Sequence, residues 1–300
     1  MRVIKANSYS IAGIGLQIDA DERYLQKELK EFALKTPSPT GESKPDVTIS
    51  VSEEEYGGNL QEKVILKGSL LTIMEGEDSF LITHNIPTCV SCYELSKSAK
   101  RAVIYLTKEV INHGTHQNTD ELEELKYAIR DSFFYYLQQY GRIVVHSASI
   151  VYSDVVWLFS APSGTGKSTH VELWKKNGYT LQDFNGDLAV CYIDDNGNAI
   201  AAGLPWCGTS GIYVNRTVPL GGIIFLQRSC SDIAVPLSGL QGTLHLLARC
   251  VTPNWTKELA DLNVTIAEKI ASKTPLAILH CTKEDSAAIV SREYIDKVSY

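Results

Sequence analysis

The segment from Ala161 to Ser168 combines the residue types of a loop that binds phosphate, and it reads Ala-Pro-Ser-Gly-Thr-Gly-Lys-Ser. Gly164 and Gly166 allow the backbone to curl until successive N–H groups point into one concavity, where they can meet phosphate oxygens. A lysine at the end of such a loop reaches the β- and γ-phosphates of a nucleoside triphosphate, and the next hydroxyl can ligate magnesium. We therefore expect Lys167 to neutralise the transferred phosphate and Ser168 to hold Mg²⁺.

The flanking residues predict the setting that a P-loop requires. An almost wholly apolar run at 155–160 predicts a strand buried on both faces, and a helix is expected through Glu172 to Trp174. The positive end of that helix would face the same anion. Ala161 stands where the usual pattern has glycine, so this position demands an ordinary backbone. The residues expected to contact ATP are Ser163, Gly164, Thr165, Gly166, Lys167, Ser168 and Thr169.

Three further side chains could serve phosphoryl transfer, which demands mainly alignment, charge stabilisation and one carboxylate near the nucleophile. Asp187 follows the predicted helix and precedes an apolar strand, so it is a candidate functional residue, or else a turn residue. His146 lies on an expected strand before the loop and is either functional or a core histidine. Arg216 is a candidate contact to phosphate or acceptor. Asp194 and Asp195 are interpreted as solvated turn residues.

Periodicity places these residues on regular elements. Apolar residues at spacings of three and four predict a helix over Asp120 to Tyr140, with caps at 118–121 and Gly141. An Asn-Gly pair between the apolar runs 188–193 and 199–204 predicts a β-hairpin. Further strands are expected at 143–146, 222–226 and 276–279, and helices at 240–247 and 255–271.

The N-terminal part is rich in short runs of alternating or β-branched apolar residues, separated by turn-forming stretches. These runs are Ser8–Ile18, Val47–Val51, Lys63–Ile73 and Ser79–His84, whereas 98–111 fits either a helix or a strand. At about 150 residues per domain, a chain of 300 residues suggests two domains. We expect a mixed, β-rich α/β protein, with an N-terminal β-rich α+β domain over 1–118 and a P-loop catalytic domain over 119–300.

Composition narrows the class of protein. The net charge of −7 argues against a nucleic-acid partner, because such a contact face needs clustered Lys and Arg. The N-terminus lacks the pattern of a signal peptide, and no apolar run approaches the roughly 20 residues that cross a bilayer. Seven cysteines, an odd number, favour reduced thiols and a cytoplasmic location. Cys89 and Cys92 form a single CxxC without a second half-site for zinc.

Taken in order, these motifs resemble those of the HPr kinase/phosphorylase-related kinases, which share a fold with ATP-dependent phosphoenolpyruvate carboxykinase. The resemblance covers about Arg142 to Gln227 and is clearest for the smaller carboxykinase-like kinases. The features that carry it are His146 before the loop, the loop sequence SAPSGTGKST, Asp187 before an apolar strand, and the elements Gly203-Leu204-Pro205-Trp206 and Asn215-Arg216-Thr217-Val218-Pro219-Leu220.

The resemblance implies roles for three residues. Asp187 would be the general base for the acceptor hydroxyl, or would hold the metal, or both; Lys167 with Mg²⁺ would neutralise the transferred group. His146 would orient or charge-balance the acceptor. The chain departs from the relatives in two places: it has Gly186-Asp187 where they have Asp-Asp, and the segment 203–208 contains no counterpart of their second metal-binding glutamate.

The favoured hypothesis is therefore a magnesium-dependent kinase that transfers the γ-phosphoryl group of ATP to a serine-type hydroxyl on a peptide, protein or small molecule. A peptide acceptor is slightly favoured, because a β-rich domain offers a sheet edge to an extended chain. One alternative is a phosphoenolpyruvate carboxykinase-type enzyme. Another is a nucleotide-binding sensor or scaffold with weak catalysis, which Gly186 keeps open. We expect no nucleic-acid or membrane partner, and a homo-oligomer is left open.

Overall fold

The computed structural model describes residues 5–34, 44–58, 63–113, 122–180 and 182–299. The chain forms two compact units, Met1–Leu137 and Gln138–Tyr300. Most of helix α2 (Glu123–Gln139) belongs to the first unit, where the Tyr136 hydroxyl donates a hydrogen bond to the Ser96 carbonyl at 3.1 Å. The caps predicted at 118–121 lie outside the described residues, whereas Gly141 follows the helix with a φ of 71°.

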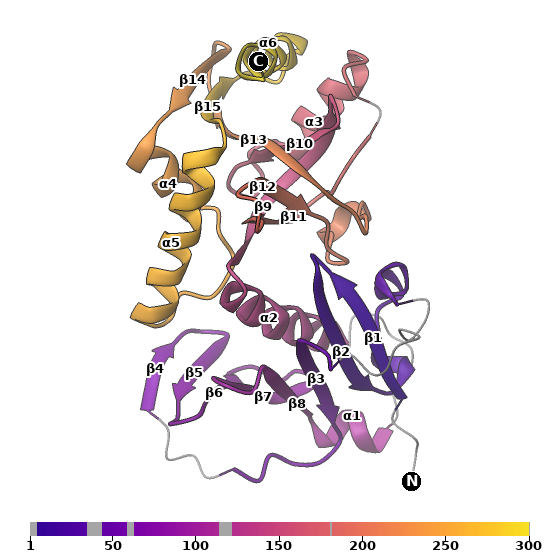
Figure 1. The fold of residues 1–300 in the computed structure, drawn as a ribbon. Helices are drawn as coiled ribbons and strands as arrows, with labels where there is room; N and C mark the ends of the chain where they lie inside the picture. Colours follow the sequence, from indigo (N-terminus) through magenta and orange to yellow (C-terminus); the bar gives the residue numbers. More distant parts are fainter. Residues whose placement is uncertain (1–4, 35–43, 59–62, 114–121, 181, 300) are drawn as a thin grey trace. The chain divides into compact units, whose positions relative to one another are not determined.

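The first unit is built on an eight-stranded mixed sheet in the order β1-β2-β3-β8-β7-β6-β5-β4 (Figure 1). Its strands are β1 (Lys5–Ile11), β2 (Ile14–Ala20), β3 (Val47–Ser52), β4 (Lys63–Lys67), β5 (Leu71–Glu75), β6 (Ser79–His84), β7 (Val90–Ser96) and β8 (Arg101–Leu106). The pairs β2–β3 and β3–β8 are parallel, and the others are antiparallel. Its remaining elements are the 3-10 helices η1 (Glu22–Tyr24) and η2 (Lys27–Phe32) and the helix α1 (Lys108–His113).

Two of the runs expected as strands are hairpins. The run 8–18 turns at Ala12-Gly13, where both residues have positive φ values of 52° and 76°. The run 63–73 turns after Lys67, where the Gly68 N–H bonds the Leu71 carbonyl at 2.9 Å. The ambiguous segment 98–111 contains both element types, since β8 precedes α1.

The second unit holds a seven-stranded mixed sheet in the order β10-β9-β11-β12-β13-β15-β14. Its strands are β9 (Arg142–Tyr152), β10 (Val155–Ser160), β11 (Leu188–Ile193), β12 (Ala199–Ala202), β13 (Thr217–Arg228), β14 (Ile233–Leu237) and β15 (Leu276–Cys281). A further parallel pairing joins β10 to β13, so the five strands from β10 to β13 close into a ring. The predicted hairpin is confirmed as β11–β12, with Gly197 at a φ of 82° in its turn.

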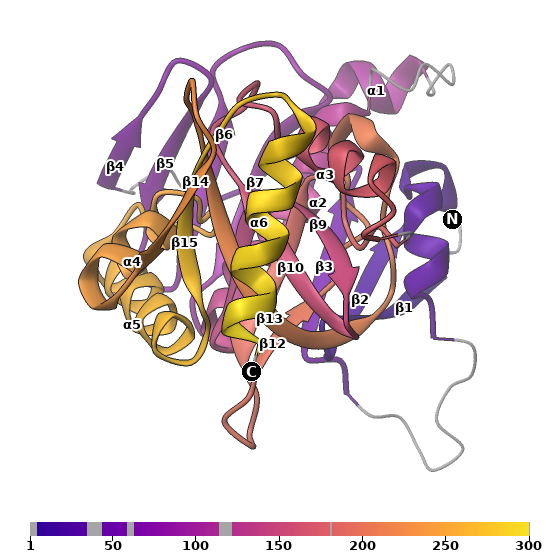
Figure 2. The ribbon, with the colours of Figure 1, turned by 90° about the horizontal axis from the view of Figure 1, so that it is seen from above.

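Helices cover both faces of this sheet. Residues of α4 (Gly239–Leu247) and α5 (Lys257–Lys273) pack in one core cluster with Ile143, Leu158 and Ile223. Residues of α3 (Lys167–Lys176) and α6 (Asp285–Val298) pack in another with Trp157 and Ile224. Figure 2 shows α6 lying over β13 and β15. Within the described residues, no helix is long and apolar enough to cross a membrane.

Candidate active site

The P-loop lies between β10 and α3, as the sequence predicted. Alternate residues of β10 enter the two core clusters, with Leu158 in one and Phe159 in the other, so both faces of the strand are buried. The chain then turns through Gly164 and Gly166, whose φ values of 72° and 124° are conformations that side-chain-bearing residues rarely adopt. Ala161 is buried and has no positive φ, as expected for alanine at this place.

Lys167 opens α3 and reaches back over the loop. Its Nζ atom donates to the Ala161 carbonyl at 3.2 Å. Burial lowers the pKa of Lys167 and the Arg249 charge adds to this, whereas the nearby Asp187 carboxylate acts in the opposite direction. An ammonium group that is partly stripped of water gains more from an incoming anion than a solvated one does. The lysine is therefore placed to interact with a phosphate held by the loop.

Arg228, at the end of β13, supports the loop from its outer side. Its Nε atom donates to the Thr165 carbonyl at 3.2 Å, and its guanidinium also donates to the Gly164 carbonyl. When these carbonyls are engaged on the outside, the peptide N–H groups of the same turn are held toward the inside. Arg228 thus holds the backbone of the loop at two successive residues.

Asp187 and His146 form the opposite side of the site. Residue 146 of β9 pairs with Leu188 of β11, and the Ser147 N–H bonds the Asp187 carbonyl at 2.9 Å. This register places the His146 Nε2 atom 3.2 Å from the Asp187 Oδ1 atom. Both side chains are partly exposed, so an acceptor could reach them. A carboxylate in contact with an imidazole is suited to orienting a hydroxyl and accepting its proton.

The 3-10 turn Gly208–Ser210 completes the wall beside Asp187. The Ser210 Oγ atom donates to the Cys207 carbonyl at 2.6 Å and accepts from the Ile212 N–H at 3.2 Å. The turn is anchored to the strand entry, because the Gly186 N–H bonds the Ile212 carbonyl at 3.0 Å. Gly208 has a φ of 57°, and a β-carbon there would lie 2.9 Å from the Asp187 Oδ2 atom. The turn therefore packs directly against the carboxylate.

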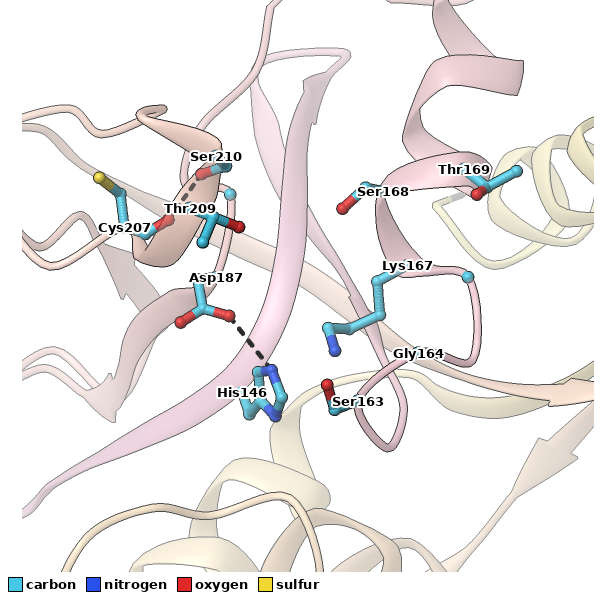
Figure 3. Close-up of a pocket in the computed structure, with 12 residues that line it drawn as sticks. His146, Ser163, Gly164, Lys167, Ser168, Thr169, Asp187, Cys207, Thr209 and Ser210 are labelled. Carbon is cyan, nitrogen blue, oxygen red and sulfur yellow. Dashed lines mark hydrogen bonds and ion pairs between the residues drawn. The ribbon is translucent and has the colours of Figure 1, made fainter.

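These parts enclose a cavity of about 360 Å³, shown in Figure 3. The loop, Lys167 and Ser168 lie on one side, and Asp187 with the turn lies on the other (Figure 3). The lining residues are His146, Ser163, Gly164, Gly166, Lys167, Ser168, Thr169, Gly186, Asp187, Cys207, Thr209 and Ser210. The carboxylate thus faces the phosphate-binding loop across an open space.

Most of the residues predicted from the sequence meet at this cavity, with two exceptions. Thr165 lines the neighbouring cavities instead. Arg216 is exposed outside the lining, and its carbonyl accepts the Gly203 N–H at 3.0 Å. Asp183 does not replace the acid that is missing at 186, because its carboxylate pairs with the Lys175 ammonium at 2.6 Å. Asp195 is exposed in the hairpin turn, as interpreted.

Sequence reasoning missed the contributions of Thr209, Ser210 and Arg228. No sequence motif identifies these three residues, because hydroxyl residues and arginines are common in proteins. All three also lie far along the chain from the P-loop. The turn is brought to the site by hydrogen bonds from residues far away in the sequence: the Gly186 N–H donates to the Ile212 carbonyl, and the buried Asn185 side chain bonds the backbone of Leu204 and Val214. Trp206, in the family-like element 203–206, is buried and does not line the cavity.

A second cavity of about 400 Å³ adjoins the outer side of the loop. It shares Gly164, Gly166 and Thr169 with the first cavity, and its walls include the apolar side chains of Leu173 and Leu226. Its other lining residues are Thr165, His170, Arg228, Ser229, Cys281, Thr282, Lys283 and Glu284. The combination of apolar walls and polar groups is typical of sites for small organic ligands.

The residues present fit magnesium that arrives with a nucleotide. Within the described ranges, no group of three or more His, Cys, Asp or Glu side chains could hold a metal ion on its own. The Ser168 hydroxyl and the Asp187 carboxylate do line the same cavity. Mg²⁺ prefers oxygen ligands and commonly uses one or two protein groups together with substrate phosphates and water. Two such donors beside a P-loop meet that requirement.

Comparisons with known proteins give little further support. No family model matches the chain, and no curated protein matches it. Among solved structures, the Hpr(Ser) kinase/phosphatase from Coxiella burnetii is similar at 11% sequence identity; the match covers 52% of this chain and 99% of that one, with a TM-score of 0.29. A likeness this low carries no argument, so the family resemblance of the motifs stays a prediction.

Proposed function

We propose that this protein binds a magnesium–nucleoside triphosphate at the loop 161–168 and transfers its γ-phosphoryl group to a hydroxyl. The observation that carries the proposal is the cavity in which Lys167 and Ser168 face Asp187. A P-loop by itself indicates only nucleotide binding, whereas a carboxylate across from it supplies the proton acceptor that transfer to a hydroxyl needs. ATP is the favoured donor, and the favoured architecture remains carboxykinase-like.

The residues divide into a donor side and an acceptor side. The loop amides from Ser163 to Thr169 and the Lys167 ammonium bind the β- and γ-phosphates. Ser168 and Asp187 would hold the magnesium ion, which supplies charge neutralisation at the transferred group when bound. The second cavity takes the nucleoside, since it opens beside the same glycines and offers the apolar surface of Leu173 and Leu226.

On the acceptor side, Asp187 accepts the proton of the attacking hydroxyl. His146 contacts the carboxylate at 3.2 Å and so holds it in orientation. We favour a serine-type hydroxyl on a peptide, because β1 and β4 form the two edges of the sheet in the first unit and an edge can bind an extended chain. A protein or small-molecule hydroxyl uses the same chemistry.

Phosphoryl transfer from labelled ATP tests the proposal, with a serine-containing peptide library, free serine and oxaloacetate as acceptors. Asp187→Asn should lower the transfer rate about 100-fold or more while nucleotide affinity stays within a few fold. Asp195→Asn, an exposed aspartate of the hairpin turn, is the matched control and should behave as the unmodified protein. Equal losses of rate and affinity would assign Asp187 to metal holding alone.

Other outcomes favour the alternatives. Labelled phosphoenolpyruvate from oxaloacetate would favour a carboxykinase. Tight nucleotide binding without any labelled acceptor would favour a binding module, for which Gly186 in place of a second carboxylate is the supporting observation.

A further inference from the structure

Hydroxyl groups of the chain itself lie on both sides of the cavity. In-line displacement requires the attacking oxygen to approach the γ-phosphorus from the side opposite the leaving group. Ser163, Ser168 and Thr169 belong to the loop and the first turn of α3, and therefore lie on the donor side. On the side of Asp187, the hydroxyl-bearing lining residues are Thr209 and Ser210. An internal nucleophile must come from this pair.

The Ser210 hydroxyl already makes hydrogen bonds that stabilise its own turn. Its hydroxyl donates to the Cys207 carbonyl at 2.6 Å and accepts from the Ile212 N–H at 3.2 Å. Attack by this oxygen would break both bonds. The thiol of Cys207 points away from the cavity (Figure 3).

Thr209 differs from Ser210 and Cys207, because its hydroxyl is not used in the turn and its side chain does not point away from the cavity. It is exposed, and its hydroxyl has no hydrogen-bond partner within the part of the chain that the structure describes. Figure 3 shows it on the wall of Asp187, with its side chain facing the loop that carries Ser168. The preceding residue, Gly208, packs against the Asp187 carboxylate, and Gly211 after the turn has a φ of 67°. Glycines at both ends leave the turn room to adjust its backbone.

We propose that Thr209 is phosphorylated by its own active site when no external acceptor fills the cavity. The Thr209 Oγ atom attacks the γ-phosphorus of the nucleoside triphosphate and forms a new P–O bond. The bond from that phosphorus to the β–γ bridging oxygen breaks, and the nucleoside diphosphate leaves with the electron pair. The hydroxyl proton passes to the Asp187 carboxylate. A hydroxyl fixed beside the donor has a high effective concentration, which favours this transfer.

This inference rests on the proposed function, and the experiment separates the two. The full-length protein is incubated with Mg²⁺ and γ-labelled ATP, and the labelled residue is located by intact-mass and peptide mass spectrometry. One phosphoryl group on Thr209 is expected, at a first-order rate that does not depend on protein concentration. Thr209→Val should lose the label, Thr209→Ser should keep it, and Asp187→Asn should lower the labelling rate about 100-fold or more.

Three results would overturn the inference. Label on a residue other than Thr209 is one, and a labelling rate that rises with protein concentration is another. The third is a protein that phosphorylates an added acceptor but leaves Thr209 unmodified when it is incubated with the magnesium nucleotide alone, in which case the proposed function stands alone. If calorimetry shows that the nucleotide does not bind, both proposals fall together. Thr209→Val replaces the hydroxyl by a methyl group of similar size, and its unfolding midpoint checks that the fold is kept.

Discussion

Gly186 is packed so closely against Ser210 that it leaves no room for a side chain: a β-carbon on Gly186 would lie 2.0 Å from the Ser210 Oγ atom and 2.5 Å from its Cβ atom. The acid that the resembled kinases carry at this place is therefore excluded by the turn that closes the cavity. The packing of this turn therefore requires glycine at position 186.

The first prediction concerns this pair. Gly186→Ala should lower the free energy of unfolding by about 1–3 kcal/mol, because the added carbon overpacks the turn. Ser210→Gly removes the clashing atoms, so the double variant should be less destabilised than the sum of the single variants. Urea unfolding measures this coupling. Gly57→Ala is the control, since a β-carbon at Gly57 meets nothing within 4 Å. Strictly additive effects would contradict the packing relationship.

A second prediction tests the support of the P-loop by Arg228. Arg228→Gln removes the guanidinium that bonds the carbonyls of Gly164 and Thr165. We expect nucleotide affinity to fall about tenfold, or ~1.4 kcal/mol, because the loop must then be ordered by the ligand itself. Isothermal calorimetry gives the affinity. Arg216→Gln, an exposed arginine outside the cavity, should leave it unchanged. The reverse pattern would restore Arg216 as the nucleotide contact predicted from the sequence.

His146 carries a third prediction. Its contact with Asp187 should orient the carboxylate, so His146→Gln should lower the rate of phosphoryl transfer about 10- to 100-fold while nucleotide affinity is retained. Rates at saturating nucleotide, measured beside the dissociation constant, distinguish the two effects. A loss of stability with normal catalysis would instead show that His146 is a core histidine.

The fourth prediction concerns the attachment of the P-loop helix to the core. Ser291 of α6 is fully buried, accepts the Trp174 indole N–H at 2.9 Å and lies 3.0 Å from the His170 Nε2 atom. Ser291→Ala leaves these buried groups short of a partner and should cost about 1–3 kcal/mol of unfolding free energy. Ser272→Ala, at an exposed position of α5, should cost little. Equal costs in urea unfolding would contradict this reading of the network.

The strand before the loop 161–168, the loop itself and the helix after it were predictable because their signals are local. Glycines, a lysine and a hydroxyl at fixed spacing after an apolar run leave few alternatives to a strand–loop–helix unit.

The hairpin at Ala12-Gly13 was missed because alanine rarely takes the positive φ that this turn requires. Helix α6 was missed because its buried stripe includes small residues such as Ala287 and Ser291, which give a weak apolar period.

The positions of Thr209 and Ser210 beside Asp187 could not be predicted from the sequence, for another reason. Thr209 and Ser210 are held beside Asp187 by hydrogen bonds that Asn185 and Gly186 make with the segment 204–214, far along the chain. The residue types of Thr209 and Ser210 do not indicate this contact. Local patterns thus predicted the loop together with Asp187 and His146, whereas the contributions of Thr209 and Ser210 required tertiary structure.

The most direct test of the account is thermal unfolding with and without magnesium–ATP, for the unmodified protein and for Lys167→Ala. At a nucleotide concentration about 100 times the dissociation constant, binding stabilises the native state by about 2.7 kcal/mol, which raises the midpoint by several degrees. We predict this rise for the unmodified protein and its loss in the variant, whose midpoint without nucleotide stays close to that of the unmodified protein. An unmodified protein that gains no protection from magnesium–ATP would contradict the central claim.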